Sequence, residues 1–298
     1  MRRTLPFLLA LLCLLAVPAA APARVVVGLG DQHAATFYDT SLRTLHLRTA
    51  RLALAWDWYR DPATVFATDQ WVAATTAAHL RPLISFNRNW RPSGRHVLPG
   101  IGTLRHSFDL LRKRYPRVRD FGVWNEANHK TQPLAHKPRM AARYYNAMRA
   151  ACRRCHIVAA DLLDDHTMAR WVATFRRYAH HPRLWGLHNY RDANNATGST
   201  RRFLRLVPGR VWLTETGGIR RPVHAKGRSH AAAYRGALRR QAKGVRRVFA
   251  IARSSHRIER VYFYQWRHDP TSPWDSAFEE ADGARRPAYR SLRAALHH

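Results

Sequence analysis

The sequence predicts an α/β protein folded as a single (β/α)8 barrel, also called a TIM barrel. Short apolar segments alternate with longer amphipathic segments along the chain, which is typical of parallel β/α units. The chain has 298 residues, and no stretch rich in Gly, Ser or Pro divides it after residue 23. That length suits one barrel domain. Polar and aromatic residues follow the apolar segments, where a barrel places its active site.

The first 23 residues have the pattern of a removable export signal. A basic start precedes an apolar run at 5–17, and A-P-A at 21–23 gives the small-x-small pattern of a cleavage site. The run is short for a membrane-spanning helix. We therefore expect a signal peptide, a secreted protein without a membrane anchor after cleavage, and one domain at 24–298.

The first half of the domain shows three strand and helix pairs. Asp61 and Pro62 are typical of a helix start, and Leu104, Phe108 and Leu111 recur at helical spacing. The predicted strands are 25–29, 50–55 and 82–86, and the predicted helices after them are 37–45, 62–78 and 101–115.

The second half continues the alternation. The fourth strand is the apolar run that begins at Phe121 and ends in Asn125 and Glu126. A loop is expected at 194–197. The remaining predicted strands are 157–160, 184–187, 211–214 and 261–264, and the remaining helices are 138–151, 166–178, 231–252 and 286–296. Eight strands in order complete a barrel.

Two glutamates end separate strands. Glu126 lies at the tip of the fourth strand, and Glu215 ends the seventh in V-W-L-T-E-T-G-G. One such acid alone could be a solvated strand end, but a barrel gathers its strand tips into one site. Glycoside hydrolysis needs two carboxyl groups, one to protonate the leaving oxygen and one to attack the anomeric carbon.

The chain is strongly basic, with a formal net charge of +32 at pH 7. Its arginines are spread through most predicted helices, without a dense basic tail or a recognisable nucleic-acid module. We expect an attraction for polyanions such as acidic glycans or cell-wall polymers, and no specific nucleic-acid partner.

Cys152 and Cys155 form the pattern C-R-R-C. In a secreted protein this pattern favours a small disulfide loop at a helix end. A redox pair or half of a zinc site are the alternatives, although neither a second Cys pair nor a neighbouring His cluster completes a metal tetrad. We expect a structural role and no metal site.

The order of these features resembles the clan of retaining glycoside hydrolases built on (β/α)8 barrels, which includes families 5 and 39. In that clan the acid/base Glu follows an Asn at the end of strand four, and the nucleophile Glu ends strand seven. Asn125-Glu126 and Glu215 stand at those positions. The resemblance runs through the mature chain and implies a glycoside hydrolase catalytic domain at 24–298.

The resemblance implies further site residues. H-N-Y at 188–190 matches a His-x-Tyr on strand six whose Tyr bonds the nucleophile, so His188 and Tyr190 are candidates. Arg51 on strand two matches an Arg beside the nucleophile, and Trp266 after strand eight matches a Trp that floors the sugar subsite. The acids that end other strands, Asp31, Asp57 and Asp161, are reserve candidates.

Each assignment has a structural alternative. His188 and Tyr190 could satisfy buried hydrogen bonds, Trp266 could pack in the core, and Arg51 could face outward and pair with a surface acid. The clan often has a His at the end of strand three, where this chain has Asn87, which argues against family 5 itself.

The resemblance implies a retaining double displacement without metal or organic cofactor. Glu215 would attack the anomeric carbon, while Glu126, held partly protonated by burial and by the charge of Glu215, would act as acid and then as base. Tyr190 would keep Glu215 ionised, and Asn125 would bond the sugar 2-hydroxyl. The two carboxyl groups should lie about 5 to 5.5 Å apart.

The substrate class is left partly open. The resemblance favours a β-glucan or a β-xyloside, and the basic surface keeps glycans with uronic acids possible. A monomer is expected. Two other functions remain: a carbohydrate-binding barrel that has lost catalysis, and a basic secreted protein that binds nucleic acid or another anionic polymer. The paired acids favour the enzyme.

Overall fold

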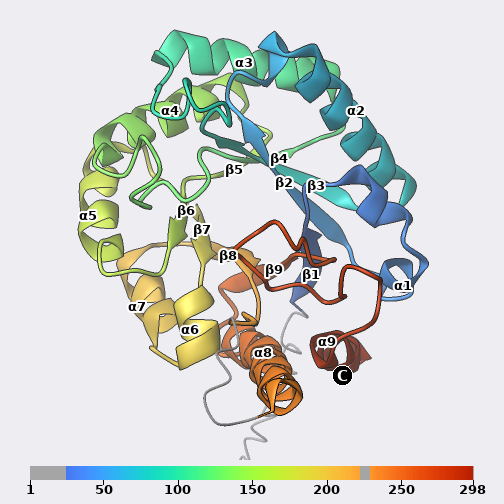
Figure 1. Cartoon of the computed structure of the whole chain (residues 1–298). Helices are drawn as coiled ribbons and strands as arrows, with labels where there is room; N and C mark the ends of the chain where they lie inside the picture. The colour runs from blue at the N-terminus through green and yellow to red at the C-terminus, as the bar shows by residue number, and fades with distance from the viewer. Residues whose placement is uncertain (1–24, 222–228, 298) are drawn as a thin grey trace, which may run out of the picture.

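The computed structural model describes residues 25–221 and 229–297, and the signal peptide expected at 1–23 lies outside these residues. Within these ranges, nine strands pair in parallel in the order β5-β4-β3-β2-β1-β9-β8-β7-β6. The sheet curls around a central axis and helices cover its outside (Figure 1). The predicted (β/α)8 barrel is confirmed.

The elements alternate along the chain as the sequence predicts. The strands are β1 (Val26–Gly30), β2 (Thr49–Ala55), β3 (Arg81–Asn87), β4 (Asp120–Gly122), β5 (His156–Val158), β6 (Asp161–Leu163), β7 (Leu184–His188), β8 (Arg210–Thr216) and β9 (Ile258–Tyr264). The helices are η1 (Ala34–Tyr38), α1 (Thr40–Arg43), η2 (Trp58–Arg60), α2 (Pro62–Ala77), α3 (Ile101–Arg114), α4 (Pro138–Ala151), α5 (Met168–Tyr178), α6 (Tyr190–Asn195), α7 (Ser199–Leu206), α8 (His230–Arg253) and α9 (Pro287–His297).

The fifth predicted strand is broken into two short strands, β5 and β6. β5 pairs with β4, and β6 pairs with β7. Between them, the Ala159 N–H donates to the Leu184 carbonyl, and the Ala160 carbonyl accepts from the Gly186 N–H, each at 2.9 Å. The strand changes its partner in the middle, and this change closes the barrel. Nine short strands therefore build eight barrel positions.

Two regions differ from the prediction, one expected as a helix and one expected as a loop. The helix expected at 37–45 is split into η1 and α1, because the Asp39 carboxylate accepts N–H groups of Ser41 and Leu42 and starts a new helix there. The expected loop at 194–197 holds the end of α6 and a turn into α7. Ala196 and Gly198 both have left-handed φ values, 53° and 68°, which separate the two helices.

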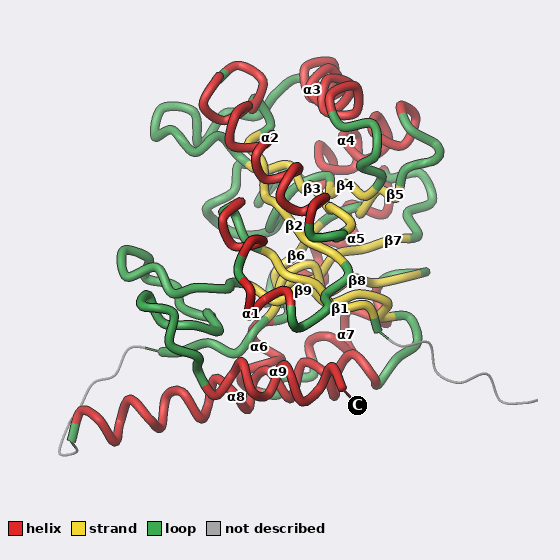
Figure 2. The backbone as a smooth tube through the Cα atoms, turned by 90° about the vertical axis from the view of Figure 1, so that its right-hand side faces the viewer, coloured by secondary structure: helices red, strands yellow, loops and turns green. Residues whose placement is uncertain are grey.

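Buried side chains fill the amino-terminal half of the barrel. There the Arg260 guanidinium lies 2.5 Å from an Asp120 oxygen and 3.7 Å from the centre of the Trp212 ring. This packing leaves the carboxyl ends of the strands as the place for polar chemistry. Figure 2 shows α8 and α9 side by side on the outside of the barrel.

The two cysteines after α4 form a disulfide, Cys152–Cys155, with an S–S distance of 2.04 Å. The predicted small disulfide loop at a helix end is confirmed. Among the described helices, none combines the length and the apolar character that a membrane crossing needs.

Candidate active site

A cavity of about 500 Å³ opens at the carboxyl ends of the strands. Its walls come from separate strands and from the loops that follow them. They include Asn87 at the end of β3, Glu126 after β4, Tyr190 after β7, Glu215 in β8 and Tyr264 at the end of β9. The barrel thus gathers residues that are far apart in the sequence.

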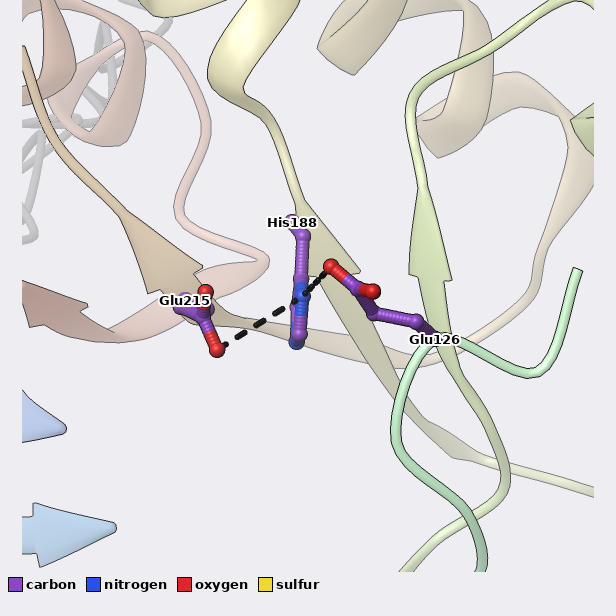
Figure 3. A group of neighbouring side chains, drawn as sticks. All are labelled: Glu126, His188 and Glu215. Atoms are coloured by element: carbon purple, nitrogen blue, oxygen red, sulfur yellow. Dashed lines mark hydrogen bonds and ion pairs between the residues drawn. The ribbon is translucent and has the colours of Figure 1, made fainter. Parts of the chain in front are cut away.

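Glu126 and Glu215 face each other across His188 (Figure 3). One oxygen of each carboxylate and a ring nitrogen of His188 lie within 4.8 Å of one another. His188 Nδ1 is 3.2 Å from Glu126 Oε1 and 3.9 Å from Glu215 Oε2. The two carboxylates are therefore close enough to act on one atom from opposite sides.

The loop after β4 aims Glu126 through an uncommon backbone conformation. Glu126 has a φ of 47°, which a residue with a side chain adopts at a cost of about 1–3 kcal/mol. Hydrogen bonds on both sides hold it: the Asn125 N–H donates to the Phe86 carbonyl at 2.6 Å, and the Ala127 N–H donates to the Asp161 carbonyl at 2.9 Å. β3 and β6 thus fix the position of the Glu126 carboxylate.

Two donors orient Glu215. The Tyr190 hydroxyl donates to Oε1 at 3.0 Å, and Arg51 Nη1 donates to Oε2 at 3.0 Å. Arg51 does not face outward, since it is fully buried, and its Nη2 also donates to Asn125 Oδ1 at 2.5 Å and to Asp161 Oδ2 at 2.9 Å. The side-chain oxygen of Asn125 is thereby occupied, and within residues 25–221 and 229–297 its side-chain N–H groups have no protein acceptor, so they can serve a ligand in the cavity.

Burial and neighbouring charges shift the pKa values of two groups in the site. Burial raises the pKa of Glu126, but the hydrogen bond and charge of His188 and the charge of His129 outweigh it, so this pKa lies below its ordinary value. This direction is opposite to the upward shift of the Glu126 pKa that the sequence predicts from burial and from the charge of Glu215. Burial and the charge of Glu215 raise the pKa of Tyr190 well above its ordinary value, which keeps the phenol a donor.

Trp266 does not line the cavity, so the expected sugar floor at this residue is wrong. Its side chain is 1% exposed and packs against Phe278 and Tyr289, with ring centres 6.1 and 5.9 Å away. The backbone N–H of Trp266 donates to Asp31 Oδ2 at 3.0 Å. That contact turns the chain away from the cavity after β9 and places the indole in the core.

Three other aromatic residues border the cavity. Tyr264 ends β9 two residues before Trp266, and Trp274 follows in the next loop with its ring centre 4.6 Å from that of Tyr190. Trp90 lines the entrance and is 58% exposed. Strand alternation could have indicated Tyr264, since Tyr262 two residues earlier also points into the barrel; the loop sequence gave no signal for Trp274.

Asn87 lies in the cavity wall, at a position where the clan that the sequence resembles often has a His. Its Oδ1 accepts from Gln132 Nε2 at 3.1 Å, and within the described residues its buried Nδ2 has no partner. Among the reserve acids, Asp161 supports Arg51, whereas Asp31 and Asp57 hydrogen-bond to neighbouring loops. Asp161 is thus the one that belongs to the site.

Glu126, His188 and Glu215 could hold a metal ion by distance alone. However, both oxygens of Glu215 already accept hydrogen bonds, and one of the donors is the Arg51 guanidinium. A cation at this point would meet that positive charge at close range. The set of donors therefore suits carboxylate and proton chemistry better than metal binding.

No protein-family model and no curated protein matches the chain. Among solved structures, it is similar to a family 39 glycoside hydrolase from the gut symbiont Bacteroides cellulosilyticus, with a TM-score of 0.62 and 14% identity over 91% of this chain and 63% of that one. The chain thus spans less than two thirds of that enzyme.

Two further structures match at similar levels. A family 39 β-xylosidase from Caulobacter crescentus has a TM-score of 0.64 and 16% identity, with 93% of this chain and 72% of that one covered. Xylanase 10B from Thermotoga maritima has a TM-score of 0.64 and 10% identity, with 92% and 95% covered. The chain therefore has the (β/α)8 fold that these glycoside hydrolases share.

Proposed function

We propose that the chain is a secreted glycoside hydrolase that cleaves O-glycosidic bonds with retention of configuration. The observation that carries the proposal is the close approach of Glu126 and Glu215, whose nearest oxygens lie within 4.8 Å in a cavity of about 500 Å³. Retaining enzymes hold their carboxyl groups about 5–5.5 Å apart, and inverting enzymes about 6.5–9.5 Å apart. The glycoside hydrolases of the same fold support the reaction class.

In the first step, Glu215 attacks the anomeric carbon and forms an ester with the sugar. The bond to the leaving oxygen breaks, and this oxygen takes the proton of Glu126. Arg51 and Tyr190 hold the Glu215 carboxylate in one orientation, so the attack needs little reorganisation. The negative charge that Glu126 acquires is stabilised by the neighbouring His188.

In the second step, Glu126 takes a proton from water, and the resulting oxygen attacks the anomeric carbon and releases Glu215. The lowered pKa of Glu126 keeps the group ionised for this role as base. The first step needs a proton on the same group, and the burial of Glu126 favours this protonated form. The Asn125 amide supports the transition state through the sugar 2-hydroxyl.

The substrate that we propose is a β-xyloside or β-glucan. The β-xylosidase and xylanase of the same fold favour this class. Trp274, Tyr264 and Trp90 line the cavity, and sugars stack on aromatic rings. Secretion rests on the leader pattern in the first 23 residues, and we propose that the mature enzyme acts as a monomer.

The test is to trap the glycosyl-enzyme. The protein is incubated with activated 2-deoxy-2-fluoro β-xyloside and β-glucoside, and peptide mass spectrometry locates the adduct. We expect a sugar ester on Glu215 and none in the Glu215→Gln variant. A folded protein that binds xylan or glucan but neither labels nor cleaves any aryl glycoside would instead be a carbohydrate-binding barrel without catalysis.

A further inference from the structure

A second cavity, of about 1070 Å³, adjoins the active-site cavity. The two cavities share His129, Leu163 and Asp165 in their walls. The chain that leaves Glu126 forms the boundary, because residues 128–130 line the second cavity. A general acid protonates the oxygen that stays with the leaving group, so the leaving group lies on the Glu126 side. The second cavity is therefore where that part of a longer substrate would continue.

The wall of this cavity is cationic. Lys130, Lys137, Arg139 and Arg170 line it with exposed side chains. In the described part of the chain, none of the four forms an ion pair; the Arg139 guanidinium instead lies 4.8 Å from the centre of the Tyr178 ring. The cations are thus free to meet an anion.

Two further features make the cavity favourable for anions. Among the described residues that line it, Asp165 is the one acid, and its Oδ1 already accepts hydrogen bonds from Asn128 and Thr167. The amino-terminal ends of α4 and α5 both open into it, and neither helix carries an acid in its first turn. Helix amino termini attract negative charge, so they add to the field of the side chains.

Another cationic groove shows what is particular about this cavity. The groove between α8 and α9 is also lined by arginines, among them Arg239 and Arg290, and none of its lining residues in the described part of the chain is acidic. It lies on the outside of the barrel and shares no lining residue with the active-site cavity. Positive charge alone is common in this chain, whereas the second cavity combines it with lining residues that it shares with the active-site cavity.

We propose that the second cavity, called the leaving-group cavity below, binds the leaving-group side of an anionic glycan. Carboxylate or sulfate groups on the sugars pair with Lys130, Lys137, Arg139 and Arg170, while Tyr178 offers an exposed ring for a sugar face. The inference rests on the proposed function and narrows it: the substrate is an acidic polysaccharide in preference to a neutral one.

The test compares probes that share one backbone and differ in their charged substituents. Binding is measured calorimetrically at physiological ionic strength for xylohexaose, the same backbone substituted with glucuronic acid, and a sulfated form. Every protein carries Glu215→Gln so that no probe is cleaved. We expect the acidic probes to bind about tenfold tighter than xylohexaose. The tighter of the two acidic probes identifies the preferred anion.

Matched double variants separate the cavity from the overall charge. Lys130→Gln with Lys137→Gln should reduce the preference for the acidic probes to about twofold, since it removes two charges from the cavity. Arg239→Gln with Arg290→Gln removes the same charge from the α8 and α9 groove and should leave the preference unchanged. Equal binding of neutral and acidic probes, or equal losses in both double variants, would overturn the proposal.

A small substrate distinguishes failure of this inference from failure of the proposed function. An aryl β-xyloside has no second sugar to reach the leaving-group cavity. This experiment uses proteins that keep Glu215. The double variant with Lys130→Gln and Lys137→Gln should cleave the aryl β-xyloside at the rate of the unaltered chain. Cleavage of this substrate without a preference for acidic probes would refute only the anionic glycan, whereas absence of cleavage by the unaltered chain would contradict the proposed function.

Discussion

Loss of Arg51 should destabilise the whole barrel as well as the site. Its guanidinium is fully buried and donates to Glu215, Asn125 and Asp161. The Asp161 carboxylate is also fully buried, and its Oδ2 has one other donor, the Ser85 hydroxyl at 2.8 Å. Within the described residues its Oδ1 has no partner. Arg51→Met would therefore leave a buried charge with a single hydroxyl to compensate it.

The expected magnitude follows from that geometry. Removing one member of a buried ion pair costs about 3–5 kcal/mol. Each 1 kcal/mol lowers the Tm of a domain near this size by roughly 2–4 °C, so Arg51→Met should lower the Tm by roughly 6–20 °C. Arg51→Met combined with Asp161→Asn should recover much of this loss, because it removes the uncompensated charge as well.

Thermal unfolding followed by circular dichroism measures the effect, with chemical denaturation as a second readout. Arg81→Met is the control, since Arg81 pairs with Asp120 at 3.4 Å but its side chain is 61% exposed. The buried Asp120 carboxylate keeps Arg260 as a partner at 2.5 Å when Arg81 is lost, so the control should cost no more than about 1 kcal/mol. The reasoning would be refuted if Arg51→Met were no less stable than this control, or if the double variant were no more stable than Arg51→Met alone.

Three further changes test separate contacts. Tyr190→Phe removes a hydrogen bond to the charged Glu215, worth about 1.5–3 kcal/mol, so kcat/KM should fall about 10- to 100-fold while the circular dichroism spectrum stays the same; an unchanged rate would contradict the contact. His188→Asn removes the group that lowers the pKa of Glu126, so the protonated form of Glu126 persists to higher pH. The alkaline limb of the kcat/KM profile should therefore shift to higher pH, and a shift to lower pH would contradict this role of His188. Trp274→Ala removes a ring from the cavity wall and should raise KM for oligosaccharides about 3- to 10-fold with little change in kcat, an effect that a purely structural Trp274 would not give.

The sequence predicted the elements whose signals are local. Pro62 and Pro138 begin α2 and α4 as expected, since Pro suits the first helical turn. The strand-end positions of Glu126 and Glu215 were also predictable, because a barrel brings strand tips together and the apolar runs mark those tips. The structure brings both into one cavity and bonds the buried Arg51 to Glu215, whereas the catalytic roles of the three residues stay predictions.

Features set by contacts between distant residues could not be read from the sequence. Trp266 is turned into the core by the carboxylate of Asp31, more than two hundred residues away in sequence. The break between β5 and β6 arises because the strand pairs with β4 on one side and with β7 on the other. The low pKa of Glu126 depends on how closely His188 approaches, which strand periodicity does not encode.

The configuration of the first product tests the central claim most directly. A β-xyloside or β-glucoside that the protein cleaves is hydrolysed in the proton NMR spectrometer, and the anomeric signals are recorded before mutarotation equalises them. Attack by Glu215 followed by attack of water predicts that the β-anomer appears first. Initial appearance of the α-anomer would mean a single displacement by water, and it would contradict the role of Glu215 as nucleophile.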